Sequence, residues 1–146
     1  MNVSYEYEKN LVAFCGQYCR DCVYYKNIFG IRAQDLLTEI EKNEWIKMVW
    51  ESLNAPFDAE DFIAHLSWLA LSPGCPGCLS GAGWPECPIR TCAQDKGVRG
   101  CFECTDFPCP AVSKEEAALQ RQFTEKVRAL GLEGYVKHKR GESEEP

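Results

Sequence analysis

The sequence predicts a small, mainly α-helical single domain with irregular, cysteine-rich, metal-bound loops. A chain of 146 residues, 45% of them hydrophobic, has the size and composition for one packed core. Helical periodicity occurs in an insertion between two groups of cysteines and again in a helix near the C-terminal end. The ten cysteines lie in segments that lack this periodicity. Such loops need a cross-link to be stable.

The domain boundaries follow from the same pattern. We expect residues 1–11 to form an N-terminal extension and residues 12–135 to form the single cysteine-rich domain. Residues 136–146 are strongly charged, and we expect them to be a frayed tail.

The helical insertion starts with residues 33–53, whose apolar side chains do not keep one direction at 100° per residue. Those before Lys42 face one side, and those after Asn43 face largely the other. A helix break near Lys42-Asn43 reconciles the two faces. Asn43 would then cap a second short helix.

The insertion continues with a helix that begins after Asp58. Asp58 is a good N-cap residue, and Asp61 in the first turn favours the helix dipole. The helix should end at Ser72-Pro73-Gly74, because proline and glycine together stop a helix. One apolar stripe is formed by Phe62, Ile63, Leu66, Leu69 and Ala70.

A closing helix is predicted after Pro110. Ser113 and Glu116 have the spacing of a capping box, and Gly131 is a natural helix stop. One face of this helix carries Leu119, Phe123, Val127 and Leu130.

The cysteines form two groups, with three in the stretch CGQYCRDC and seven between residues 75 and 109. A Cys-x2-Cys turn can place two thiolates on one metal ion, and several such turns occur here. We therefore predict metal ligation, with no assignment of which thiols share a site. The candidate ligands are Cys15, Cys19, Cys22, Cys75, Cys78, Cys87, Cys92, Cys101, Cys104 and Cys109.

Zinc is the expected metal, because a structural ion is the simpler way to stabilise a small, loop-rich domain. An iron–sulfur cluster is the alternative, although the run of cysteines typical of bacterial ferredoxins is absent. The spacing Cys15-x3-Cys19-x2-Cys22 is that of radical S-adenosylmethionine enzymes, but this chain is too short and too poor in βα pattern for their barrel. A redox dithiol is disfavoured because no βαβ pattern surrounds any pair.

Charge and composition restrict the partners. The net charge of −6 disfavours a broad nucleic-acid-binding surface, although a local patch of Arg90, Lys96 and Arg99 leaves a zinc-dependent nucleic-acid binder as a third alternative. No stretch has the length of a membrane span. Residues 1–10 have no secretory pattern, so we expect a cytoplasmic protein, where thiols bind metal more often than they form disulfides.

No serine or cysteine has a recognisable histidine and carboxylate partner pattern, so the sequence does not predict an enzyme. We expect instead a metal-binding module that acts in interaction or regulation, with a protein as the possible partner.

The order of these features resembles the DUF3795 family, small cysteine-rich bacterial and archaeal proteins of uncharacterised function. The stretches that carry the resemblance are FCGQYCRDCVYY (14–25), PGCPGCLSG (73–81), CPIRTCAQDKGVRGCFECTDFPC (87–109) and the closing helix. The resemblance implies metal binding through the cysteines. It implies no substrate, because the family has no assigned activity.

Overall fold

The computed structural model describes residues 5–142, which are mainly helical and contain no β-strand. The helical, cysteine-rich part of the predicted fold class is therefore confirmed. The chain forms two compact units. Unit 1 contains the chain up to Cys22 and again from Pro76 onward, and unit 2 is Val23–Cys75.

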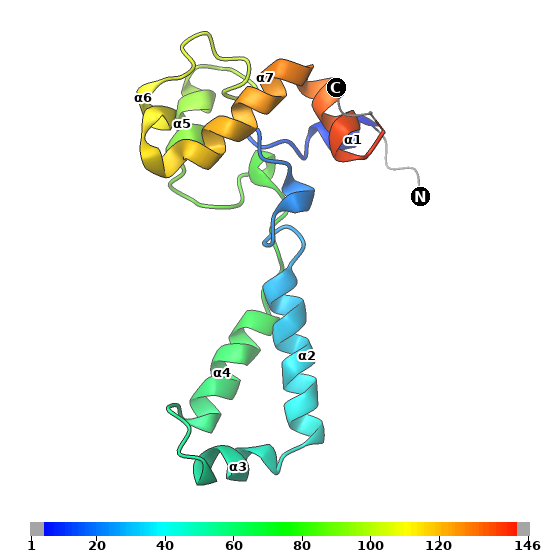
Figure 1. Ribbon diagram of the computed structural model, residues 1–146, viewed down its shortest axis with the longest axis vertical. Helices are drawn as coiled ribbons and strands as arrows, with labels where there is room; N and C mark the ends of the chain where they lie inside the picture. Colours follow the sequence, from blue (N-terminus) through cyan, green and yellow to red (C-terminus); the bar gives the residue numbers. More distant parts are fainter. Residues whose placement is uncertain (1–4, 143–146) are drawn as a thin grey trace. The chain divides into compact units, whose positions relative to one another are not determined.

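Unit 2 consists of three helices, and α2 packs against α4 (Figure 1). Its core has four buried members, Ala33, Leu37, Ile40 and Leu66. The predicted apolar stripe on α4 is confirmed, because its other members pack against this core. The helices are α2 (Ile28–Lys42), α3 (Ile46–Ser52) and α4 (Ala59–Ala70).

The helix ends of unit 2 agree in part with the sequence. The predicted break is confirmed, because α2 ends at Lys42 and α3 begins at Ile46. The predicted role of Asn43 is wrong. It lies at the C-terminal end of α2, where its side-chain amide donates to the Glu39 carbonyl at 2.9 Å. The Asp58 cap is confirmed, since its carboxylate accepts from two backbone N–H groups of the first turn of α4, each at 2.9 Å.

The two ends of unit 2 are tied to each other by hydrogen bonds. The Asn27 side chain donates to the Ser72 carbonyl at 3.1 Å, and the Cys75 N–H donates to the Tyr24 carbonyl at 3.0 Å. Asn27 itself has a left-handed backbone, with φ of 50°, which asparagine tolerates better than most residues. Unit 2 is therefore a closed helical insertion.

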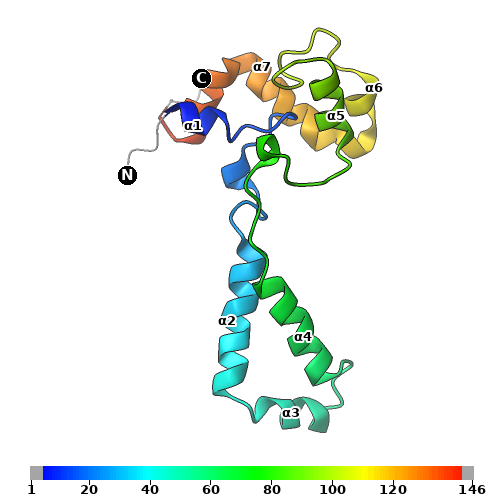
Figure 2. The same cartoon turned by 180° about the vertical axis from the view of Figure 1, so that it is seen from behind.

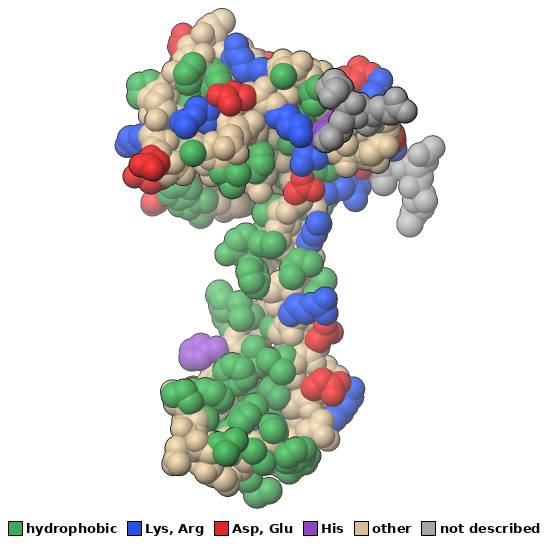
Figure 3. All heavy atoms as spheres, in the orientation of Figure 1, with side chains coloured by type: hydrophobic (Ala, Val, Ile, Leu, Met, Phe, Trp, Pro, Cys, Tyr) green, Lys and Arg blue, Asp and Glu red, His purple; other side chains and the backbone are tan. Residues whose placement is uncertain are grey.

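Hydrophobic side chains gather on the face of unit 2 seen in Figure 3. Most of the large hydrophobic side chains that the structure exposes belong to this unit. The most exposed are Trp68, at 74%, and Leu71, at 83%. Exposed hydrophobic side chains that gather on one face have the character of a contact surface.

Unit 1 is built from helices and short 3-10 turns joined by loops. In both views of the ribbon, α7 runs from α6 to α1 (Figure 2). Its elements are α1 (Tyr5–Lys9), η1 (Cys19–Asp21), η2 (Cys78–Ser80), α5 (Pro88–Asp95), α6 (Pro110–Ser113), η3 (Glu115–Ala117) and α7 (Ala118–Lys139).

Helix α5 lies inside the cysteine-rich segment that the sequence analysis described as irregular. Pro88 occupies the first turn directly after Cys87, a position that suits proline because its missing N–H would have no helical partner there. Ile89 and Ala93 are buried on one face. The Cys87-Pro88 pair was the available signal for this helix.

The closing helix begins and ends differently from the prediction. The capping box at Ser113 is wrong, because α7 begins at Ala118 and the Ser113 hydroxyl donates to the Cys109 carbonyl at 2.8 Å. Gly131 does leave helical geometry, with φ of 68°, but the helix resumes after it and continues to Lys139. The second half buries Tyr135 and Val136.

The segment that follows α1 runs through the centre of unit 1. Val12 is completely buried, and the Phe14 carbonyl accepts from the Cys101 N–H at 2.8 Å. The buried Thr124 hydroxyl of α7 donates to the Cys15 carbonyl at 2.9 Å. These bonds connect the N-terminal segment to the cysteine-rich loop on one side and to α7 on the other.

The two segments expected to be an extension and a frayed tail both contain residues that contact the rest of unit 1. Within residues 1–11, Glu8 and Leu11 are buried. Within residues 136–146, Lys139 forms an ion pair with Asp21 at 2.5 Å. Residues 1–4 and 143–146 lie outside the described residues.

Candidate metal centre

The ten cysteines differ in how deeply they are buried. Cys19, Cys101 and Cys104 are buried, and the other seven are half-buried. Thiols with so little exposure are packed groups of the fold, and most of them lie in unit 1.

Four of the thiols line one small cavity in unit 1. They are Cys92, Cys101, Cys104 and Cys109, and the cavity has a volume of about 10 Å³, which is about the space of one water-sized sphere. Two of them share a turn, closed by a hydrogen bond of 3.2 Å from the Cys104 N–H to the Cys101 carbonyl. Cys92 is on α5, and Cys109 immediately precedes α6. Three separate segments therefore contribute thiols to one place.

Basic side chains surround this four-cysteine cavity. The Lys96 ammonium lies 3.8 Å from the Cys104 sulfur and forms an ion pair with Asp106. The Arg128 guanidinium donates to the Cys104 carbonyl at 2.9 Å and lies over the Phe107 ring. Positive charge at this position would offset the negative charge of clustered thiolates.

The surroundings of Cys101 disfavour its thiolate form. Burial raises the pKa of Cys101 to about 11, and the neighbouring thiols, Cys109 first among them, add to the rise. A metal ion must therefore displace protons on binding, as at thiolate sites in general. The same burial favours a bound ion, because it excludes competing water.

A second contact between thiols joins η1 to η2. The Cys19 sulfur lies beside the residue that precedes η2, since a Cβ added to Gly77 would lie 3.8 Å from it. The neighbouring Cys78 lowers the pKa of Cys19 to about 6, against the opposing effect of burial, and Arg99 contributes to the lowering. This contact brings the two cysteine groups of the sequence together in unit 1.

The other four cysteines are Cys15, Cys22, Cys75 and Cys87. Cys15 and Cys87 pack against the core formed by Ile89, Cys101 and Val112. Cys22 closes η1 with a 2.9 Å hydrogen bond from its N–H to the Cys19 carbonyl. Cys75 is the last residue of unit 2.

The four thiols line one cavity, but their sulfur atoms do not surround a common position for a metal ion. Among the described residues, no group of three or more His, Cys, Asp or Glu side chains is positioned to hold a metal ion. The donor set at the cavity is nevertheless the set that tetrahedral zinc prefers, four cysteine sulfurs. Bringing them onto one ion requires side-chain rotation within the cavity.

Two of the three basic residues that the sequence suggested as a surface patch, Arg90 and Arg99, bind backbone carbonyls of unit 1. Arg90 is buried and donates to the carbonyls of Ala82, Trp84 and Pro85 at 2.6 to 2.8 Å. Arg99 donates to two carbonyls of the N-terminal segment. Both guanidinium groups are used inside unit 1, which removes the basis for a nucleic-acid contact through them.

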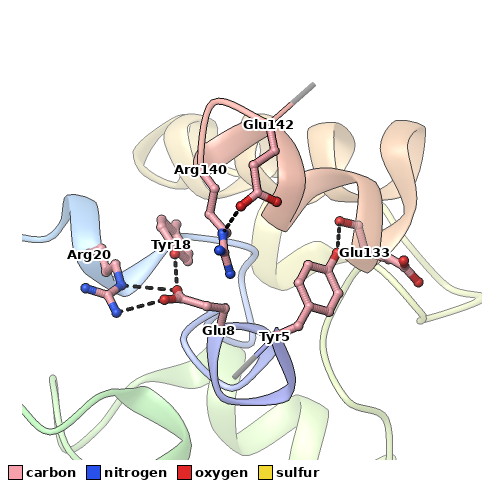
Figure 4. A network of polar contacts seen from close by, with 7 residues as sticks. All are labelled: Tyr5, Glu8, Tyr18, Arg20, Glu133, Arg140 and Glu142. Atoms are coloured by element: carbon pink, nitrogen blue, oxygen red, sulfur yellow. Dashed lines mark hydrogen bonds and ion pairs between the residues drawn. The ribbon is translucent and has the colours of Figure 1, made fainter. Parts of the chain in front are cut away.

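A buried polar network positions η1, and none of its residues stood out in the sequence. The Glu8 carboxylate accepts from the Tyr18 hydroxyl and from Arg20, whose Nη2 lies 2.7 Å away (Figure 4). Burial opposes ionisation of Glu8, but the hydrogen bonds from Arg20 and Tyr18 outweigh it and lower the pKa of the carboxyl. A separate hydrogen bond connects α1 to α7, in which the Tyr5 hydroxyl donates to the Glu133 carbonyl at 2.5 Å. Sequence spacing carries no signal for such a network.

The family model described as "Protein of unknown function (DUF3795)" matches residues 11–114. The chain belongs to the DUF3795 family. The match covers every cysteine, and it ends before α7. Neither a curated protein nor a solved structure matches the chain. Within the described part of this DUF3795 chain, no helix is both long and apolar enough to cross a membrane.

Proposed function

We propose that this DUF3795 chain is a metal-binding module in which Cys92, Cys101, Cys104 and Cys109 hold one zinc ion. The observation that carries the proposal is the cavity that all four thiols line. A zinc ion there would cross-link α5, the 101–104 turn and α6. Structural zinc contributes on the order of 10 kcal/mol to folding, which is ample to hold loops that bury little apolar surface.

Zinc is preferred here over an iron–sulfur cluster, because a single ion bound by four thiolates is the simpler cross-link for a small, loop-rich unit. The Lys96 ammonium beside Cys104 would offset part of the net −2 charge of a zinc ion with four thiolates. Hydrogen bonds to ligand sulfur are the usual support of such sites.

Metal analysis of anaerobically purified full-length protein tests this proposal. We expect zinc at a defined stoichiometry and a colourless solution. Cys104→Ser should lose one equivalent of zinc, whereas Thr105→Ala, a change at the neighbouring exposed position, should keep it. Brown protein with iron and broad visible absorption would contradict zinc. Full zinc content in Cys104→Ser would contradict the assignment of the cavity.

A role in interaction is supported by unit 2. Its exposed apolar side chains, Trp68 and Leu71 among them, have the character of a protein contact surface. The zinc ion would then stabilise unit 1, and unit 2 would bind the partner protein. Analytical ultracentrifugation of the wild type and of Trp68→Glu measures whether this surface drives self-association. If both proteins are monomeric, self-association is excluded, and the proposed partner is a different protein.

A further inference from the structure

We propose that the α3 end of unit 2 is a docking face for a basic, amphipathic helix of another protein. This α3 face consists of exposed hydrophobic side chains and of the acidic side chains next to them. The inference rests on the interaction role proposed above and names the class of partner. It does not depend on the zinc ion. The hydrophobic members are Trp45, Met48, Leu53 and Phe57.

The hydrophobic members of the α3 face are between 43% and 73% exposed. Trp45 directly precedes α3 and Met48 lies one turn later, so both are on one side of this helix. Leu53 and Phe57 belong to the segment that joins α3 to α4. Figure 3 shows hydrophobic side chains over this part of unit 2, between α2 and α4. Exposed apolar groups that gather in this way indicate an interaction surface.

An aromatic cluster supports the α3 face. The Trp50 ring lies edge-on to the rings of Phe57 and Phe62, with centroids 5.6 and 5.8 Å apart. The centroids of Phe57 and Phe62 are 5.0 Å apart. Trp50 and Phe62 also pack against the buried core of unit 2. The face is therefore in place before a partner binds, which lowers the entropic cost of docking.

Negative charge at the α3 end is not compensated within the chain. Residues 36–61 contain seven acidic and two basic side chains, and most of the net charge of −6 comes from them. Both basic side chains are already paired, Lys42 with Glu39 and Lys47 with Glu60, each at 2.8 Å. Within the part of the chain that the structure describes, four exposed carboxylates of this segment have no ion pair, those of Glu41, Glu44, Glu51 and Asp61.

The acidic and hydrophobic side chains of the α3 face are neighbours. Glu51 lies three residues after Met48 in α3, and Glu44 directly precedes Trp45. A helix with one apolar side would cover the hydrophobic members, as in other helix-in-groove complexes. Its lysine or arginine side chains would reach the flanking carboxylates. Such charge complementarity selects partners and speeds their association.

Two other partners suit this face less well. A second copy of the chain would bring one acidic segment against another, and like charges facing each other across an interface are unfavourable. A bilayer with anionic headgroups would repel the same carboxylates. A basic helix is the partner that satisfies both the apolar surface and its charge.

Binding of a synthetic peptide to the full-length protein tests the α3 face. The probe is a fluorescein-labelled helical peptide of leucine and lysine, with its leucines along one side. The control peptide has glutamate in place of each lysine. Fluorescence anisotropy should show saturable binding of the lysine peptide, weakened by added salt because salt screens exposed charges. The glutamate peptide should not bind.

Matched variants locate the binding surface. Leu53→Ser should weaken binding of the lysine peptide at least about fivefold, as expected for a residue that matters at an interface. Leu119→Ser, at an exposed leucine of α7 in unit 1, should leave it unchanged. Glu51→Gln should weaken binding and reduce its salt dependence, whereas Glu125→Gln, at an exposed position of α7, should do neither. Circular dichroism spectra of all four variants should match the wild type, because the replaced side chains are exposed.

Four outcomes would overturn this inference. One is no saturable binding of the lysine peptide, and another is equal weakening by Leu53→Ser and Leu119→Ser. The third is a dimer, seen by analytical ultracentrifugation, that Met48→Glu abolishes, because the partner would then be a second copy. The fourth is binding to phosphatidylglycerol vesicles that Leu53→Ser weakens, because the face would then meet a membrane.

Failure of this inference can be told apart from failure of the proposed function. A protein that binds the lysine peptide but contains no zinc would contradict only the zinc site. A protein that does not bind the peptide, yet self-associates in a way that Trp68→Glu abolishes, would keep the interaction role of unit 2 and contradict only the basic partner at the α3 face.

Discussion

Two glycines of unit 1 have a left-handed backbone, and only one of them lies close to another part of the backbone. Gly16 has φ of 84°, and a Cβ there would lie 2.8 Å from the backbone carbon and oxygen of Phe123 in α7. Gly97 has φ of 64° with nothing within 4 Å of such a Cβ. The two positions share the left-handed backbone and differ only in the space around it.

We expect Gly16→Ala to destabilise the protein more than Gly97→Ala. The left-handed conformation costs an alanine about 1–2 kcal/mol at either position. At Gly16 the clash with α7 should add about 1–3 kcal/mol. Urea unfolding of both variants measures the difference, and equal losses would show that α7 can move away from this turn.

The buried Glu8 carboxylate should make stability depend on pH in the acid range. Its pKa is lowered from the ordinary 4.5 in the folded protein, so its stabilising contribution is present above about pH 4.5. The contribution is lost as the pH falls through the lower, folded-state pKa. Glu8→Gln should therefore cost about 2 kcal/mol near pH 7 and flatten the acid limb of the stability curve.

The matched control for Glu8 is Glu6→Gln. Glu6 is 80% exposed in its side chain and pairs with Lys9 on the surface of α1. Surface pairs contribute little, so this variant should unfold like the wild type at every pH. An acid limb unchanged in Glu8→Gln would contradict the assignment of the network.

At the scale of elements, the capping signal succeeded at Asp58 in unit 2 and failed at Ser113 in unit 1. Asp58 caps α4 because its short side chain brings the carboxylate to the backbone N–H groups of Glu60 and Asp61. Ser113 has the same kind of signal, yet its hydroxyl bonds back to Cys109. The chain there turns through α6 and η3 before α7 begins. The Ser113 hydroxyl is thereby used inside α6 and is not available to cap α7.

Asp58→Ala should destabilise α4 by about 1 kcal/mol, because it removes the acceptor for two N–H groups of the first turn. Asp58→Ser keeps a capping oxygen and should recover most of this loss. Urea unfolding followed by circular dichroism measures both variants. Identical midpoints for Asp58→Ala and wild type would show that the packing of α2 on α4 alone sets this helix.

At the scale of the whole molecule, the two units have cores of different kinds. Unit 2 packs aliphatic and aromatic side chains around Leu37 and Leu66. Unit 1 has a core that includes Cys101 with Ile89 and Val112, and other thiols pack around it. Loss of metal should therefore act on one unit and spare the other.

Hydrogen exchange with and without a chelator tests this division. We expect amides in residues 88–109 to lose protection when the metal is removed, because their loops lose the cross-link. Amides of α2 and α4 should keep theirs, because no cysteine takes part in that core. Equal loss of protection in both units would show that they unfold together, and no loss anywhere would contradict a structural metal.

The sequence by itself determined the helical class, the break after Lys42, the cap at Asp58, the cysteine content and the family. Each of these depends on neighbours within about four residues or on the spacing of a motif. Only the tertiary structure decided which thiols share a cavity, that Cys19 lies beside Gly77, and that Arg99 reaches the N-terminal segment. These outcomes depend on groups distant in sequence, which only the packing of α7 and the N-terminal segment around the cysteine-rich loop brings together.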